Sequence, residues 1–112
     1  MKKIEAIVRP EKLDEVISAL EGVGYSGVMI TEIRGHGKQK GIVQKWRGEE
    51  YHVPFLAKVK VEIVAKNKDV EKIKNAVIEA ARTGEIGDGK IFISSVEDAV
   101  KIRTGESGED IV

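Results

Sequence analysis

Residues 56–66 read Leu-Ala-Lys-Val-Lys-Val-Glu-Ile-Val-Ala-Lys, so apolar and polar side chains alternate along them. A period of two residues is typical of a strand that has one face on a core. The core face is expected to hold Val59, Val61, Ile63 and Ala65, and the other face Lys58, Lys60, Glu62 and Val64. A helix should follow, capped by Asn67, with a buried stripe of Val70, Ile73, Val77 and Ala80 or Ala81. This strand and helix form one half of the expected fold.

The N-terminal half has the same order of elements. Residues 3–9 alternate as a strand, and Pro10 suits the first position of a helix. The helix stripe is Leu13, Val16, Ile17 and Leu20, and Gly22 and Gly24 end it. Further strands are expected over 28–34 and 91–93, and the polar tail from Lys101 is expected to fray. Together these elements predict an α+β fold, a ferredoxin-like βαββαβ sandwich with one antiparallel sheet and two helices on one face.

The second face of this sheet would be mixed in character. It is expected to carry Lys3, Glu5, Lys58, Lys60 and Glu62, interspersed with Ile7 and Val64. Such a face is either simply solvated or packed against other subunits, since mixed charges with apolar residues suit a self-complementary contact.

Length and charge narrow the class of protein. The chain has 112 residues, which fits one domain over 1–112. Lys and Arg number 19, as do Asp and Glu, so the excess of cations typical of nucleic-acid binders is missing. There is no cysteine for disulfides or thiolate metal sites, and the charged start resembles neither a signal peptide nor a membrane anchor. The expected location is the cytoplasm.

Residues 82–90 read Arg-Thr-Gly-Glu-Ile-Gly-Asp-Gly-Lys. Glycines let a backbone turn tightly and present N–H groups, and a terminal lysine adds positive charge, so this loop suits phosphate oxygens. Its G-x-x-x-x-G-K spacing matches a P-loop, but Ile91 stands where Ser or Thr should follow, and the loop runs from helix to strand. A helix cap followed by a simple turn is the alternative.

Residues 37–55 have no sustained period and are expected to form a long mobile loop that binds partners. Aromatic residues and arginine are typical interface anchors, which points to Trp46, Arg47 and Tyr51. In the alternative, Val43, Trp46, Tyr51 and Phe55 belong to a hairpin that covers the core.

Catalytic and metal-binding patterns are weak. His36 and His52 have no cysteine or carboxylate at ligand spacing, and no Ser–His–Asp arrangement is visible. A slow ATPase or phosphoryl transferase, with Asp88 or Glu62 as base, is one competing hypothesis. An RNA-binding ferredoxin-like domain is another, although strands 3–9 and 56–66 lack the aromatic residues on which bases stack.

Two distant motifs resemble the PII nitrogen-regulatory signal proteins. Residues 46–51, Trp-Arg-Gly-Glu-Glu-Tyr, look like the family's modification-site motif, and residues 83–92 look like its C-terminal signature. The run 101–106 fits the family's tail, so the resemblance covers the whole chain. It implies a non-enzymatic homotrimer of ferredoxin-like subunits.

The resemblance also implies a nucleotide site between subunits that takes ATP or ADP. Its residues here would be Ile7, Gly27, Val28, Met29, Gly35, Gly37, Lys38, Gln39, Glu62, Val64, Gly87, Asp88, Gly89, Lys90, Lys101 and Arg103. Within this set, residues 87–90 would cradle the phosphates, and Lys90, Lys101 and Arg103 would neutralise them.

With MgATP present, 2-oxoglutarate would bind at the base of loop 37–55. Gln39 would ligate Mg²⁺ together with the phosphates, and Lys58 would pair with the distal carboxylate. The site would hold Gly37, Gln39, Lys40, Gly41, Lys58 and Gly87. The family's targets are ammonium transporters, which provide its only link to a membrane, and nitrogen-assimilation enzymes. Tyr51 is the candidate modification site, and no nucleic acid is expected.

The sequence departs from the family pattern at several positions. Lys38 and Lys101 stand where arginine is frequent, and lysine lacks the bidentate fork. Met29 replaces a common threonine, which removes a hydroxyl near the adenine. Trp46 replaces tyrosine and Pro54 replaces an acid, changes that bear on partner choice.

Overall fold

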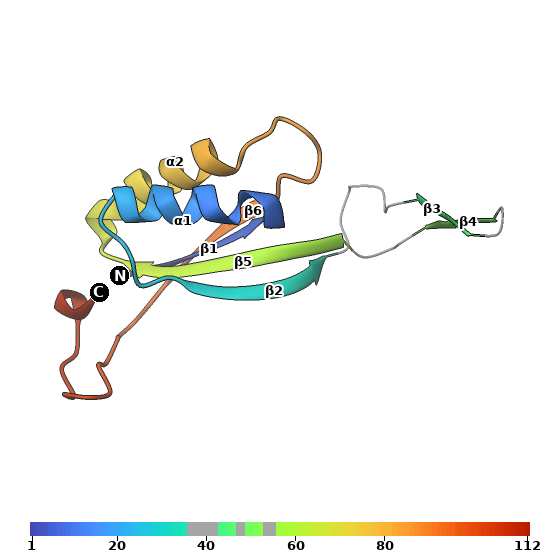
Figure 1. The fold of residues 1–112 in the computed structure, drawn as a ribbon. Helices are drawn as coiled ribbons and strands as arrows, with labels where there is room; N and C mark the ends of the chain where they lie inside the picture. The colour runs from blue at the N-terminus through green and yellow to red at the C-terminus, as the bar shows by residue number, and fades with distance from the viewer. Residues whose placement is uncertain (36–42, 47–48, 53–55) are drawn as a thin grey trace.

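The computed structural model describes residues 1–35, 43–46, 49–52 and 56–112, with side chains for 1–34 and 57–112 (Figure 1). The strands are β1 (Lys2–Val8), β2 (Met29–Gly35), β3 (Val43–Trp46), β4 (Glu49–His52), β5 (Leu56–Ala65) and β6 (Lys90–Ser95). The α-helices are α1 (Leu13–Gly22) and α2 (Val70–Ala81). Short 3-10 turns are η1 (Pro10–Lys12), η2 (Asn67–Asp69) and η3 (Glu109–Ile111).

Four strands form one sheet in the order β2-β5-β1-β6, and each neighbouring pair is antiparallel. Both helices lie on the same face of this sheet (Figure 1). The order places β1 and β5 in the centre and β2 and β6 at the edges. This is the ferredoxin-like βαββαβ arrangement that the sequence predicts.

The core lies between the sheet and the helices. Pairing sets Ile4 opposite Ile63 and Ala6 opposite Val61, so the apolar faces of β1 and β5 coincide. The expected core face of β5 is confirmed, since all four of its residues are at most 5% exposed. The helices add the buried residues Val16, Leu20, Ile73, Val77 and Ala81. Burying these side chains drives the helices onto the sheet.

The expected cap of the second helix is wrong. Asn67 begins the 3-10 turn η2, whose N-cap is Lys66, and neither η2 nor α2 has a side-chain cap hydrogen bond. The Lys66 amide instead donates to the Tyr25 hydroxyl at 3.3 Å, and that hydroxyl donates to Asp69. Tyr25, which is distant in sequence, therefore ties down the segment before α2, and no described side chain caps either helix.

The C-terminal tail is more ordered than its polar sequence predicts. Val100 and Ser107 form a β-bridge, the Lys101 amide donates to the Glu106 carbonyl at 2.7 Å, and the Gly105 amide donates to the Lys101 carbonyl at 2.8 Å. The expectation of a fraying segment is therefore wrong for residues 100–107, which form a compact turn.

Within 37–55, β3 and β4 pair as an antiparallel hairpin, with Val43 opposite His52 and Trp46 opposite Glu49. A hairpin in this segment was part of the alternative, which expected it to cover the core. Figure 1 shows the hairpin beyond the ends of β2 and β5, so it does not cover the helix-side core as the alternative required. In the part of the chain that the structure describes, no helix is long and apolar enough to cross a bilayer.

Candidate functional site

Loop 82–90 joins the end of α2 to the start of β6 and passes close to β1. Gly84, Gly87 and Gly89 all have positive φ angles, of 90°, 104° and 97°. A Cβ on Gly89 would lie 1.7 Å from the carbonyl oxygen of Ile7, so only glycine fits there. The loop backbone is thereby held directly against the end of β1.

The Asp88 carboxylate organises this loop from inside. One oxygen accepts the backbone N–H groups of Thr83 at 2.8 Å and Gly84 at 2.9 Å. The other accepts the Thr83 hydroxyl and the Arg9 Nε at 3.1 Å. These bonds link the start of the loop to its end, so the Asp88 side chain is engaged within the protein.

Arg9 reaches this loop from the residue after β1. Its Nε forms the ion pair with Asp88, and a second guanidinium nitrogen donates to the carbonyl of Ile86 at 3.0 Å. The Arg9 and Asp88 side chains are only 17% and 24% exposed, so solvent screens this pair less than a fully exposed one. One cation thus holds two points of the loop.

These contacts control the charge of Asp88. Hydrogen bonds from the Thr83 hydroxyl and amide, then from Gly84 and Arg9, hold the pKa of Asp88 far below its usual range. Each bond favours the ionised form, because a carboxylate accepts where a protonated acid must also donate. Asp88 is therefore an anion at any physiological pH.

Lys58 holds the loop from a second strand. Its Nζ, projecting from β5, donates to the carbonyl of Gly87. Burial, and then the nearby Arg9 charge, lower the pKa of Lys58 from its usual value. The residue expected to pair with a dicarboxylate therefore lies directly beside the expected phosphate loop.

A cavity of about 380 Å³ opens beside the loop, between α2 and the paired strands β1 and β6. Its lining includes Asp88, Gly89 and Lys90, and two further cations, Lys74 and Arg82. The rest of the lining is mostly apolar. Cations around a partly apolar hollow suit a ligand that carries both negative charge and an apolar part.

A second group of expected site residues lies further along the sheet. Met29 pairs with Glu62 across β2 and β5, and Met29 is 52% exposed. Gly27, Met29 and Val64 line a separate hollow of about 560 Å³ that Val112 also borders. Val28 instead packs against the core. Glu62 pairs with Lys60 at 2.9 Å, and this hydrogen bond lowers the pKa of Glu62.

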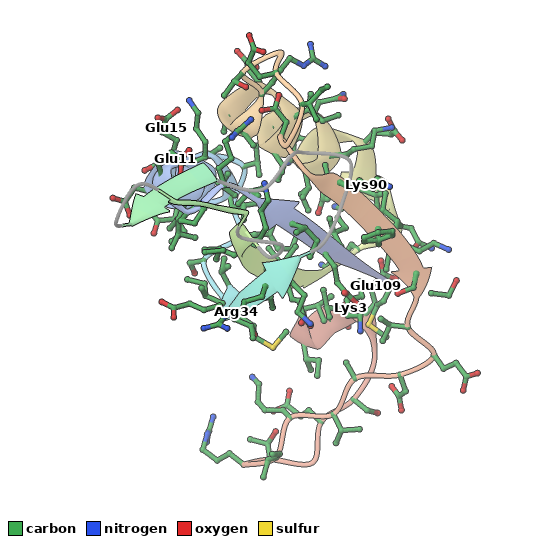
Figure 2. All side chains as sticks on the ribbon, turned by 90° about the vertical axis from the view of Figure 1, so that its right-hand side faces the viewer. Lys3, Glu11, Glu15, Arg34, Lys90 and Glu109 are labelled. Atoms are coloured by element: carbon green, nitrogen blue, oxygen red, sulfur yellow. The ribbon has the colours of Figure 1, made fainter. Side chains whose placement is uncertain are left out.

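The third group, Lys101 and Arg103, lies far from the loop in the same chain. Lys90 begins β6, whereas the tail leaves after Ser95 at the other end of that strand. A strand of this length spans roughly 20 Å. Figure 2 shows Lys90 beside β6 and the tail continuing from the arrowhead. One chain therefore does not bring Lys101 and Arg103 to Lys90.

The remaining expected site residues belong to the segment around β3 and β4. Those that lie outside the described residues are Gly37, Lys38, Gln39, Lys40, Gly41 and Arg47. Gly35, Trp46 and Tyr51 are described only as backbone positions in β2, β3 and β4. Within the described ranges, no group of three or more His, Cys, Asp or Glu residues is arranged to hold a metal ion.

Sequence reasoning missed Arg9 and Thr83 as organisers of the loop. Arg9 and Asp88 are 79 positions apart, and no local pattern joins them. The available signal was indirect, since a ferredoxin-like sheet brings the end of β1 beside the start of β6. Thr83, which is five residues before Asp88, could have been found as a short-range hydroxyl–carboxylate contact.

Comparison with known proteins gives consistent matches. A family model described as nitrogen regulatory protein P-II matches residues 1–106. A nitrogen regulatory protein P-II from Bradyrhizobium diazoefficiens is 56% identical over 112 residues, and all of both chains are covered. Nitrogen regulatory protein P-II 2 from Methanothermobacter thermautotrophicus is 52% identical, covering all of this chain and 97% of the relative. A crystal structure of Arabidopsis thaliana PII bound to citrate superposes with a TM-score of 0.80 at 47% identity, over 97% of this chain and 89% of that one.

Proposed function

This chain belongs to the nitrogen regulatory protein P-II family, and from that membership we propose that it senses nucleotide and carbon status as a homotrimer. In this proposal each cleft between subunits binds ATP or ADP, and with MgATP also 2-oxoglutarate. The membership makes the chain a regulatory signal-transduction protein and not an enzyme, as the sequence predicts.

The observation that carries the proposal is the separation of the expected phosphate ligands. Loop residues 87–90 and the tail residues Lys101 and Arg103 lie at opposite ends of β6. A single nucleotide can contact both groups only if they come from different chains. A cyclic trimer, in which every interface repeats, supplies such a meeting point three times.

The cations of the loop and the tail suit the phosphates of a nucleotide. The loop itself contributes Lys90, and the tail of a second subunit would contribute Lys101 and Arg103. Because the Asp88 carboxylate is neutralised by Arg9 and by loop hydrogen bonds, its backbone rather than its side chain would contact phosphate. Gly27, Met29, Glu62 and Val64 would then surround the nucleoside.

The 2-oxoglutarate part of the proposal depends on Lys58. Its ammonium group donates to the Gly87 carbonyl, beside the expected phosphate loop, and would supply the positive charge that a carboxylate requires. Gly37, Gln39, Lys40 and Gly41 would wrap the ligand, and Gln39 would ligate Mg²⁺ with the phosphates. The Arabidopsis relative is bound to citrate, so at least one family member takes a small carboxylate.

Residues 37–55 would transmit the bound state of the site to partner proteins. In this proposal 2-oxoglutarate draws the base of the segment inward, and a partner that requires another conformation is released. Trp46, Arg47 and Tyr51 would contact an ammonium transporter or a nitrogen-assimilation enzyme in the cytoplasm. Tyr51 would also be the position of any covalent modification.

Neither of the two candidate bases of the enzyme alternative suits that role. Asp88 is held ionised with its pKa far below neutrality, and Glu62 is paired with Lys60 with its pKa also lowered. A general base works best with a pKa near the working pH. Neither carboxylate meets that requirement, which agrees with a regulatory role.

Calorimetry tests the proposal directly. ATP should bind the full-length protein, and affinity should rise when 2-oxoglutarate and Mg²⁺ are added together, because the ligands would share a metal. Lys58→Gln should lose the gain from 2-oxoglutarate while keeping ATP binding. Absence of ATP binding, or ATP affinity indifferent to 2-oxoglutarate, would contradict the proposal.

A further inference from the structure

We infer that Arg9 is a positioning residue, which acts through Asp88 to hold loop 82–90 in its phosphate-binding shape before any nucleotide arrives. This inference rests on the proposed nucleotide site, but its structural part can be measured without a ligand. Arg9 would act on the loop and not on the nucleotide.

The contacts form a closed network around the loop. Asp88, near the loop's end, accepts the amides of Thr83 and Gly84 at its start. Arg9 then binds Asp88 through Nε and the Ile86 carbonyl through a second nitrogen. The start, middle and end of the loop are therefore joined through one carboxylate and one guanidinium group.

The network also explains why an anion is tolerated in a phosphate loop. An isolated carboxylate at position 88 would repel phosphate, since like charges a few ångströms apart disfavour each other. Arg9 offsets that charge from the side of β1, and the Thr83 and Gly84 amides surround it with donors. Asp88 can then shape the loop without weakening its attraction for phosphate.

Arginine suits this task better than lysine. The two Arg9 contacts use different nitrogens of one planar group, aimed at a carboxylate and at a backbone carbonyl. A lysine ammonium is a single point charge and lacks this rigid fork. Arg9→Lys should therefore keep the charge balance and lose part of the geometry.

A loop already in its bound shape needs less ordering when the ligand binds, which increases affinity. Removing Arg9 should loosen the loop and also expose the Asp88 charge to phosphate. Both effects weaken binding of ATP and ADP. Each involves a charged hydrogen bond, so the expected loss in affinity is about tenfold or more.

The first experiment uses no nucleotide. Hydrogen exchange by NMR is followed at the Thr83 and Gly84 amides in the wild type, Arg9→Gln and Arg82→Gln. Arg82 is the matched control, because it is exposed and begins the same loop, and its side chain has no hydrogen bond or ion pair with other described residues. Arg9→Gln should exchange about tenfold faster at both amides, and Arg82→Gln should match the wild type. The pKa of Asp88 should rise in Arg9→Gln alone.

The second experiment measures ATP affinity by calorimetry in Arg9→Gln, Arg9→Lys, Asp88→Asn and the double variant Arg9→Gln/Asp88→Asn. Arg9→Lys should recover part of the affinity that Arg9→Gln loses. In the Asp88→Asn background, loss of Arg9 should have much less effect, because the two side chains act together. Thermal unfolding of each variant identifies any that fail to fold.

The outcomes distinguish the role of Arg9 in the loop from the proposed nucleotide-sensing function. Unchanged exchange and an unchanged Asp88 pKa in a folded Arg9→Gln protein would overturn the role of Arg9. Equal acceleration of exchange at Thr83 and Gly84 in Arg9→Gln and Arg82→Gln would also overturn it, because it would indicate a simple effect of charge. If the wild type bound no ATP while the exchange results held, the proposed function would fail and the loop network would stand.

Discussion

At position 89 the shape of loop 82–90 depends on the absence of a side chain. Gly89 has a φ of 97°, and an added Cβ would lie 1.7 Å from the Ile7 carbonyl oxygen. Gly89→Ala should therefore displace the loop from β1 and destabilise the protein by roughly 2–4 kcal/mol, from steric overlap added to backbone strain. Denaturant unfolding measures the loss, and ATP calorimetry should show weaker binding.

Gly84→Ala is the matched control for this change. Gly84 has a similar φ of 90°, but nothing lies within 4 Å of its added Cβ. Only the backbone strain remains, about 1–2 kcal/mol. Equal destabilisation by the two variants would contradict the account of Gly89, because the carbonyl of Ile7 would then have no effect.

Tyr25 provides a second test at the scale of one residue. Its hydroxyl donates to Asp69 and accepts the Lys66 amide, so Tyr25→Phe removes two hydrogen bonds and should cost about 1–2 kcal/mol. Burial, and then the bond to Asp69, raise the pKa of Tyr25, while the same bond lowers the pKa of Asp69. The contact therefore needs neutral tyrosine and ionised aspartate.

The directions of these two pKa shifts predict how the stability contributed by the Tyr25–Asp69 contact depends on pH. A lowered carboxyl pKa contributes stability that is present above the unfolded value, about 3.9, and is lost as the pH falls through the folded value. A raised tyrosine pKa contributes stability that is present below about 10 and is lost as the pH rises through the folded value. The effect of Tyr25→Phe should thus be largest between these limits in urea unfolding. Ser26→Ala, which removes an exposed neighbouring hydroxyl, should show no such profile.

At the scale of elements, the apolar residues of α2 differ in how deeply they are buried. Ile73 in α2 is fully buried, whereas Ile78 in the same helix is only partly buried. Ile73→Ala should cost about 2–5 kcal/mol through lost burial and a remaining cavity. Ile78→Ala, the same change in chemistry, should cost clearly less. Thermal or urea unfolding compares them, and equal losses would contradict the assigned orientation of α2.

Regular burial made the main elements predictable. In β5 the alternation of valines with charged residues matches the pairing with β1, because a strand exposes successive side chains to opposite faces. The order of strands and helices then left few possible arrangements. The hairpin of β3 and β4 was harder to predict, since its sequence has no strong alternation to mark it.

Contacts between distant segments could not be predicted in the same way. The sequence marked loop 82–90 through its glycines and lysine, but Arg9 lies 79 positions from Asp88 and carries no local signal. Likewise Tyr25 is 44 positions from Asp69, and no local pattern marks the hydrogen bond between them. Such contacts depend on how the strands align, which only the assembled sheet fixes.

At the scale of the whole molecule, the open face of the sheet suits contact with other subunits. Phe92 and Met29 are each more than half exposed, and they pair with Glu5 and Glu62 in the central strands. Charged residues on this face also pair among themselves, as in Lys3–Glu5 and Lys60–Glu62, both at 2.9 Å. Apolar residues among internally paired charges can be buried between subunits at low electrostatic cost.

Subunit mixing tests whether the nucleotide site is shared in the proposed way. Lys90→Gln removes the loop cation and Arg103→Gln removes a tail cation, so a homotrimer of either variant should lose most ATP affinity. If every site takes its loop from one chain and its tail from another, about a quarter of the sites in random mixed trimers contain both Lys90 and Arg103. Coexpression in equal amounts, followed by ATP calorimetry, should therefore recover a minority of tight sites.

The control for mixing is a double variant, Lys90→Gln/Arg103→Gln, coexpressed with the wild type. Shared sites would then again be intact in about a quarter of cases, whereas sites contained within one chain would be intact in about half. For the two single variants, sites within one chain would give no recovery at all, because each chain would lack one cation. The pair of ratios thus decides whether Lys90 and Arg103, placed at opposite ends of β6 in one subunit, meet across an interface.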